Sequence, residues 1–319
     1  MATAATVSPR DVQATFTYVD LSNPSWADPI SFPSDEEKRK NIKDLPGNQK
    51  PVVTREFVVR DVTAELDKFT LDTHGFQYLK HKTKLSKADF ADDDKVKSVL
   101  YPEVVDLVKK ITGASYIYCY DHQTRGPVKA NADKNVPTEN PVHFVHCDQS
   151  YDGAKIIALS RIPDKAFAEK VVQGRFAIMN VRVPPINRIS ALWHHSLVIL
   201  TMPWKVWRPV KTIYKDPFAC ADATSVIDET DLAPMPIQAD ERIEEAWAVG
   251  PNDKHRWYFK YAQQPDEVLI FKNFDSHGPV RRIVHSAFID PAHAQDYDRE
   301  SIEMRCIVSF DQAPPKGIV

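Results

Sequence analysis

Glycine is scarce in this chain of 319 residues, which holds nine glycines against 24 prolines. No G-x-G-x-x-G or G-x-x-x-x-G-K-[ST] pattern occurs, so the sequence argues against the glycine-rich loops that most often cradle nucleotide phosphates. The many prolines instead favour short strands that are separated by turns.

Cysteine is equally scarce, and its spacing argues against two common roles. The cysteines stand far apart in the chain, and no two of them form a C-x-x-C pair. A structural zinc site and a disulfide framework are therefore not expected. The four cysteines are Cys119, Cys147, Cys220 and Cys306.

A strong charge of one sign and long apolar runs are also missing. The net charge is only -3, so no nucleic-acid partner is indicated, and we expect a small-molecule substrate. Residues 1–11 lack the apolar stretch of a secretory signal. The most apolar run, residues 189–203, contains His194 and His195 and is shorter than the ~20 residues that span a bilayer. We expect a soluble cytoplasmic protein with no membrane partner, and the sequence does not indicate its oligomeric state.

The chain begins with a segment rich in proline and charge. We expect residues 1–50 to form an irregular arm, because Pro24, Pro29, Pro33 and Pro46 would break a helix, and residues 51–319 to form a single domain. The clearest helix is expected at residues 92–113, where acidic residues crowd the first turn and Gly113 stands at the end. Pro102 lies inside this pattern and predicts a kink or a division into two helices.

From residue 115 onward the pattern changes to short β segments with no long helix between them. This succession predicts a mainly β fold with flanking helices, built as a jelly roll or barrel. Such a fold holds a ligand in its mouth. The expected strands are residues 115–122, 142–149, 175–181, 218–225, 242–249, 256–261, 267–274, 284–289 and 301–310.

The second of these strands carries an H-x-D pattern. Side chains on a strand alternate between its faces, so His146 and Asp148 are expected to point the same way, alongside Phe144. An imidazole and a carboxylate on one face supply two ligands of the 2-His-1-carboxylate triad, which leaves positions on Fe(II) open for a co-substrate and dioxygen. By itself the pattern is weak evidence in a chain with 11 histidines.

Two histidines compete for the third ligand position, His277 on a turn and His285 at the start of a strand. Arg299 favours His285, because it follows that histidine by 14 residues and opens the last long strand. A guanidinium can hold the distal carboxylate of a 2-oxo acid in a bidentate, charge-assisted pair. Arg299 and Ser301 share a strand face and are expected to grip one carboxylate together. Arg305 has the same parity and is the alternative, although either arginine is also typical of a surface ion pair.

Several longer motifs resemble the fungal AsaB-type hydroxylase/desaturase family, which is also related to a cephem methoxylase subunit. That family is similar in turn to Fe(II)/2-oxoglutarate-dependent oxygenases with a double-stranded β-helix core. The resemblance runs from about residue 54 to residue 310. Its motifs are R-F-A-I-M-N at 175–180, V-W-R-P at 206–209, D-P-F-A-C-A-D at 216–222, W-Y at 257–258, D-E-V-L-I-F-K-N-F-D-S at 266–276, H-S-A-F at 285–288 and R-E-S-I-E-M-R at 299–305.

The resemblance implies a set of site residues and cofactors. His146, Asp148 and His285 become the ligands of Fe(II), and the reaction also uses 2-oxoglutarate and dioxygen. The implied activity is hydroxylation or desaturation of a small molecule in secondary metabolism. The candidates for 2-oxoglutarate are Arg299 and Ser301, followed by Arg305, with Tyr118 and Asn180 nearby. The candidates for the substrate are Arg125, Trp207 and Arg208, and Tyr120 is a further aromatic residue beside the metal strand.

One stretch departs from the family pattern. In the family, the equivalent of Asn180-Val181 continues directly into Trp-Arg-Pro, whereas residues 182–206 intervene here before Trp207. Without residues 182–206, the chain would read Asn-Val-Trp-Arg-Pro, as the family does. We interpret residues 182–206 as an atypical insertion and hypothesise that they are a translated intron. His194 and His195 lie inside this stretch and are assigned no metal role.

Two other classes of protein use the same fold. A redox-neutral metalloenzyme of the cupin type, such as an isomerase, would use the same histidines without 2-oxoglutarate. Release of succinate coupled to substrate oxidation separates it from an oxygenase. A non-catalytic binding module would tolerate the loss of His146 or His285.

Overall fold

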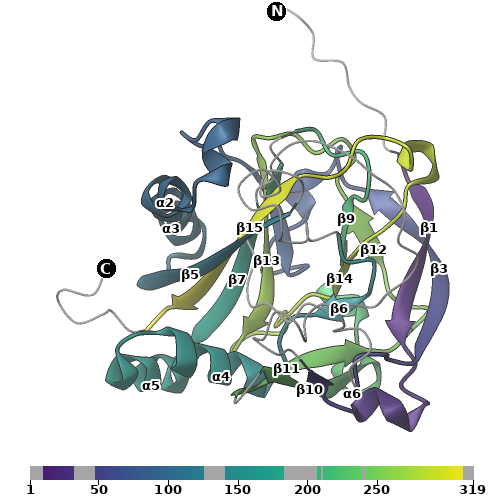
Figure 1. Cartoon of the computed structure of the whole chain (residues 1–319), viewed down its shortest axis with the longest axis horizontal. Helices are drawn as coiled ribbons and strands as arrows, with labels where there is room; N and C mark the ends of the chain where they lie inside the picture. Colours follow the sequence, from purple (N-terminus) through teal and green to yellow (C-terminus); the bar gives the residue numbers. More distant parts are fainter. Residues whose placement is uncertain are drawn as a thin grey trace, which may run out of the picture.

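The computed structural model describes residues 10–31, 47–125, 141–182, 207–209, 211–239 and 242–311. Two β-sheets face each other and helices flank them, as predicted (Figure 1). Among the described residues, no helix is both long and apolar enough to cross a membrane.

The larger sheet has nine strands, and one of them is the strand that begins the H-x-D pattern. Its order is β1 (Val12–Val19), β3 (Val52–Asp61), β12 (Trp257–Phe259), β9 (Phe218–Ala221), β14 (His285–Ala287), β6 (His146–Cys147), β11 (Arg242–Val249), β10 (Leu232–Ala239) and β2 (Ile30–Ser31). Most neighbours in this sheet are far apart in the chain, although β10 and β11 follow each other directly.

The smaller sheet contains the last long strand, which lies next to one edge of the sheet. Its order is β4 (Phe76–Lys80), β13 (Glu267–Asp275), β7 (Phe176–Arg182), β15 (Ser301–Ser309) and β5 (Tyr116–Arg125), and β8 (Trp207–Pro209) pairs with β13 and β15. Every residue of β13 and of β15 is buried, because both faces of this sheet are covered. The helices are α2 (Asp93–Lys95), α3 (Tyr101–Thr112), α4 (Tyr151–Arg161), α5 (Lys165–Gln173) and α6 (Asp228–Asp231).

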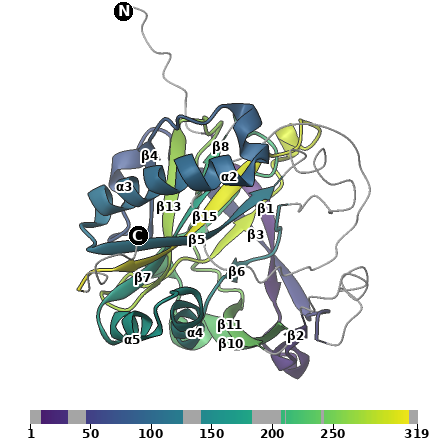
Figure 2. The same ribbon diagram turned by 60° about the vertical axis from the view of Figure 1, so that its left-hand side comes forward.

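The predicted helix at residues 92–113 is divided at the expected place. A π-helical turn, Val96–Leu100, separates α2 from α3, and Pro102 stands in the first turn of α3. Proline cannot donate the backbone hydrogen bond of a helix interior, so the turn before it widens. Gly113 ends the helix in the left-handed conformation with φ of 69°. Helix α3 lies across the smaller sheet (Figure 2), and its buried residues Val104 and Val108 belong to one apolar cluster with Met304 of β15.

One expectation about the first half of the chain is wrong. Residues 12–19 form strand β1 of the larger sheet rather than part of an irregular arm. They alternate between buried and exposed side chains, and Phe16 stacks on Trp257 with 4.2 Å between the ring centroids. The prolines that suggested irregularity begin only after this strand, at Pro24.

Helices do intervene between the strands of the second half, contrary to expectation. α4 and α5 lie between β6 and β7 and cover one end of the smaller sheet. Ser150 caps α4, because its Oγ accepts a hydrogen bond from the backbone N–H of Gly153 at 2.9 Å. Asp164 caps α5 in the same way through the N–H of Phe167.

Strands β7 and β8 lie end to end between β13 and β15, although residues 183–206 separate them in the chain. On β13, Val181 lies opposite Ile270 and Trp207 lies opposite the next residue, Leu269. On β15, Val181 lies opposite Met304 and Trp207 lies opposite the next residue, Glu303. The pairing therefore passes from Val181 to Trp207 without a missing step. Residues 183–206, with His194 and His195, lie outside the described part of the chain.

Candidate metal centre

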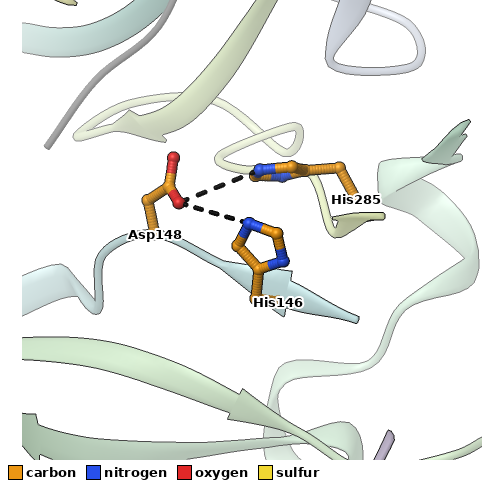
Figure 3. A group of neighbouring side chains, drawn as sticks. All are labelled: His146, Asp148 and His285. Atoms are coloured by element: carbon orange, nitrogen blue, oxygen red, sulfur yellow. Dashed lines mark ion pairs between the residues drawn. The ribbon is translucent and has the colours of Figure 1, made fainter. Parts of the chain in front are cut away.

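The three residues expected to bind iron lie together at the junction of two strands. His146 on β6 is directly opposite His285 on β14, and their ring centroids are 4.2 Å apart. Asp148 directly follows β6 (Figure 3). The strand is shorter than expected, because Phe144 makes only an isolated bridge to Thr17 and packs into an apolar cluster. The strand therefore ends within the H-x-D pattern, between Cys147 and Asp148.

The donor atoms of these residues converge on one point. All of them lie within 4.8 Å of one another. Oδ1 of Asp148 is 3.6 Å from Nε2 of His146 and 3.8 Å from Nε2 of His285, as the dashed lines of Figure 3 show. Two neutral imidazole nitrogens and one carboxylate oxygen are the donor set of the 2-His-1-carboxylate triad, so the residues present fit an Fe(II) ion. His277, the rejected alternative, lies on the exposed turn after β13 and bonds to Ser276.

Neighbouring groups orient each of these side chains. Nδ1 of His146 lies 2.6 Å from the carbonyl oxygen of Phe144, an arrangement that directs Nε2 toward Asp148. The amide of Asn273 donates a hydrogen bond from Nδ2 to Oδ2 of Asp148 at 2.9 Å. The ring of His285 packs between Phe218 and Phe271, with centroid distances of 5.2 and 5.0 Å. The three donors are thus held in place by the protein itself.

A small pocket opens beside the two histidines. It combines apolar side chains with two arginines and one glutamate, which suits a small anionic ligand. Its lining residues are Arg125, Val142, His146, Phe218, His285, Ala287, Arg299 and Glu303.

Arg299 is almost fully buried in this lining, with 3% of its surface exposed. Its Nη1 donates a hydrogen bond to the backbone carbonyl of Asp216 at 2.6 Å. Asp216 adopts the left-handed conformation with φ of 50°, and its carboxylate accepts a contact from His143 at 3.0 Å. Burial and the neighbouring charge of Arg125 lower the pKa of Arg299 to about 9, although Asp216 partly opposes them.

Arg305 has a different environment from that of Arg299. It is fully buried, and its guanidinium pairs with the carboxylate of Asp121 and donates a hydrogen bond to Gln123 at 2.9 Å. Its Nη2 is also 3.7 Å from Glu303. Arg305 thus ties β15 to β5, whereas Arg299 lines the pocket.

The other predicted site residues are distributed over both sheets. Ser301 is buried on β15 opposite Arg125 of β5, and Arg125 lines the pocket. Tyr118 and Tyr120 stack on each other and pack against α4 and α5, away from the pocket lining. Three further candidates, Asn180, Trp207 and Arg208, lie on β7 and β8, and their side chains are outside the described part of the structure.

Two residues at the site were not anticipated from the sequence. Asn273 contacts Asp148, and Glu303 lines the pocket 3.6 Å from Nε of Arg125. Glu303 follows Ser301 on the same face of β15, so strand parity is the signal that would have found it. Asn273 lies 125 residues from its partner, and no local pattern indicates that contact.

The fold and the triad together define a class, the jelly-roll enzymes with a 2-His-1-carboxylate metal site. A family model described as an Oxidoreductase/YMDC permease-like domain matches residues 18–192 and 201–309. The alpha-ketoglutarate-dependent dioxygenase phiK of a fungal species is 30% identical over 249 residues, which cover 76% of this chain and 80% of phiK. The hydroxylase/desaturase CTB9 of Cercospora beticola is 32% identical over 265 residues, which cover 76% of this chain and 72% of CTB9.

A solved structure shows the same fold. The iron and alpha-ketoglutarate-dependent endoperoxidase NvfI superposes with a TM-score of 0.69 at 23% identity, covering 95% of this chain and 99% of that one. The chain belongs to the family of Fe(II)/2-oxoglutarate-dependent dioxygenases and hydroxylase/desaturases. The predicted family, fold and class of enzyme are therefore confirmed, and Fe(II), 2-oxoglutarate and dioxygen are the cofactors that this family uses.

Proposed function

We propose that His146, Asp148 and His285 hold the Fe(II) of this enzyme. The observation that carries the proposal is the convergence of their three donor atoms beside a pocket that ends in a buried arginine. Bound there with 2-oxoglutarate and dioxygen, the metal supplies the oxidising power that attacks a C–H bond of a small molecule. The product is a hydroxylated or desaturated metabolite, together with succinate and carbon dioxide.

Arg299 is proposed to bind the distal carboxylate of 2-oxoglutarate. Its Nε has no hydrogen-bond partner among the described residues, and the lowered pKa reports a buried charge that lacks full compensation. A carboxylate in the pocket would supply both the acceptor and the opposite charge. Oγ of Ser301 is likewise buried without a partner in the described part of the chain and offers a second donor. Arg305 is less suited, because its Nη1 and Nη2 already donate to Asp121 and Gln123 and it does not line the pocket.

Arg125, Trp207 and Arg208 remain our candidates for contacts with the substrate, and Asn180 for contacts with the co-substrate. Tyr118 is less suited to that role, because it packs against α4 and α5. Arg125 has the best support, because it lines the same pocket as the two histidines. The substrate is proposed to be a secondary metabolite, as the resemblance to the AsaB-type family implies. A cytoplasmic location is part of the proposal and is supported by four buried, unbridged cysteines.

An anaerobic titration tests this function. Addition of 2-oxoglutarate to the protein with Fe(II) should produce the weak visible charge-transfer band of the chelate, and admission of oxygen should release succinate. The His146→Ala protein should show neither signal. If the wild-type protein binds Fe(II) but shows no band and releases no succinate, the redox-neutral alternative replaces the proposal.

A further inference from the structure

Asn273 is the extra residue of a β-bulge in strand β13. On the neighbouring strand β7, Met179 lies opposite Lys272 and Ile178 lies opposite Phe274, so Asn273 has no opposite residue there. A bulge bends its strand and turns a side chain away from the direction that regular pairing would give it. Bulges of this kind are frequent beside active sites.

The side chain of Asn273 is completely buried and bonds to a proposed metal ligand. Its Nδ2 donates to Oδ2 of Asp148 at 2.9 Å, whereas the histidine nitrogens lie near the other carboxylate oxygen, Oδ1. The backbone reinforces this contact, because the thiol of Cys147 lies 3.9 Å from the carbonyl oxygen of Asn273. The bulge thus lies directly against the H-x-D pattern.

A buried ion pair fixes the bulge. Nζ of Lys272 lies 3.0 Å from Oδ2 of Asp275. The two residues of this ion pair stand before and after Asn273 in β13. Arg175 holds the same Asp275 oxygen at 3.1 Å. The backbone N–H of Lys272 donates to Gly75 at 2.8 Å, and its carbonyl accepts from Ile283 at 2.8 Å. The position of Asn273 is therefore set from both sides of the strand.

The amide of Asn273 is an expensive group to bury at this position. Its Oδ1 has no hydrogen-bond partner among the described residues. A buried carbonyl without a partner destabilises a fold, and an apolar residue of similar size would avoid that cost. The stability of the sheet therefore does not explain why an amide stands here, whereas the hydrogen bond to Asp148 does.

We propose that Asn273 is a positioning residue for the metal centre, an inference that rests on the proposed function of His146, Asp148 and His285. By engaging Oδ2, the amide sets the rotation of the Asp148 carboxylate so that Oδ1 faces the two histidines. A carboxylate that offers one oxygen leaves coordination positions open for 2-oxoglutarate and dioxygen. Loss of a hydrogen bond to a metal-ligating group typically weakens metal binding by about 10- to 100-fold.

The test compares Asn273→Leu with the wild-type protein in titrations with Co(II), followed by calorimetry and by the visible absorption of the bound ion. We expect Co(II) affinity to fall about 10- to 100-fold and the absorption spectrum to change. The thermal midpoint of the metal-free protein should stay the same or rise. A residue that only stabilises the fold would show the reverse, a lower midpoint with unchanged affinity. If the leucine variant does not fold, Asn273→Ala is measured by the same criteria.

Asn252→Leu is the matched control. Asn252 also donates an amide hydrogen bond to a buried carboxylate at 2.9 Å, that of Asp231, but no described contact links it to the triad. The Asn252→Leu protein should bind Co(II) with the same affinity as the wild-type protein. The inference is overturned if Asn273→Leu binds within twofold of the wild type, or if Asn252→Leu weakens binding equally. Failure of the wild-type protein itself to bind Co(II) would instead overturn the proposed function.

Discussion

His285 lies directly opposite His146 in the antiparallel pairing of β14 with β6, and on its other side it pairs with Cys220 of β9. Its backbone is therefore held between two strands, and its ring is packed between Phe218 and Phe271. Two of the three proposed ligands are fixed by sheet register rather than by a loop. A site built in this way needs little rearrangement when it binds a metal ion.

The first prediction concerns the choice between the two candidate histidines. We expect His285→Ala to weaken Co(II) or Fe(II) binding by at least about 100-fold, because losing a ligand should cost more than losing its hydrogen-bond partner. The control is His277→Ala, because His277 is exposed on a turn. Calorimetric titration of both proteins makes the comparison. Equal metal affinity in the two variants would refute the assignment of His285.

The second prediction concerns Arg299. Arg299→Gln should bind 2-oxoglutarate about 10- to 100-fold more weakly, since a hydrogen bond to a charged group contributes about 1.5–3 kcal/mol. Metal affinity should not change, because Arg299 bonds to the backbone of Asp216 and not to the triad. Equilibrium titration with 2-oxoglutarate under anaerobic conditions measures the effect. Wild-type affinity in this variant would transfer the role to another donor.

The third prediction follows from the lowered pKa of the same arginine. Arg299 is charged below a pKa of about 9 and loses its proton as the pH rises through that value. An anion binds the charged form, so the affinity for 2-oxoglutarate should be constant below pH 9 and fall tenfold for each further pH unit. Pyruvate is the matched ligand, since it has the same 2-oxo acid end but no distal carboxylate. A parallel decline for pyruvate would show that Arg299 is not the cause.

The sequence predicted the jelly roll, because the succession of short β segments is a local property of the chain. Strand parity and spacing also made His146, Asp148 and Arg299 candidates for one site, and the structure brings the first two together with His285. The strand β1 was missed because the prolines that begin at Pro24 outweighed the alternation before them. The contact of Asn273 with Asp148 could not be predicted, since it depends on a bulge and on how two sheets pack.

The fourth prediction concerns the ion pair that fixes the bulge. Lys272→Met should lower the free energy of unfolding by about 3 kcal/mol, because it leaves the Asp275 carboxylate buried with one charged partner fewer. The control is Lys155→Met, since Lys155 forms an exposed pair with Asp152 at 2.9 Å, and such pairs contribute about 0–1 kcal/mol. Urea denaturation of both variants measures the difference. An equal effect in the two proteins would show that the Lys272 pair does not stabilise the bulge.

The last prediction concerns residues 182–206. Val181 and Trp207 already occupy consecutive positions opposite both β13 and β15, so a chain that joins them directly would extend β7 into β8 without a change of register. The family model also leaves residues 193–200 unmatched. We therefore expect the variant that lacks residues 182–206 to fold and to unfold at an equal or higher temperature, because closing a shorter connection costs less chain entropy.

Thermal unfolding and Co(II) binding of the shortened protein measure this effect. Metal affinity should match that of the full chain, since His146, Asp148 and His285 lie on other strands. A matched deletion that also removes Trp207 would take away the residue that continues the pairing, and it should lower the midpoint. Sequencing of the transcript gives an independent answer. A messenger RNA that encodes residues 182–206, together with a shortened protein that fails to fold, would establish this stretch as a genuine part of the enzyme.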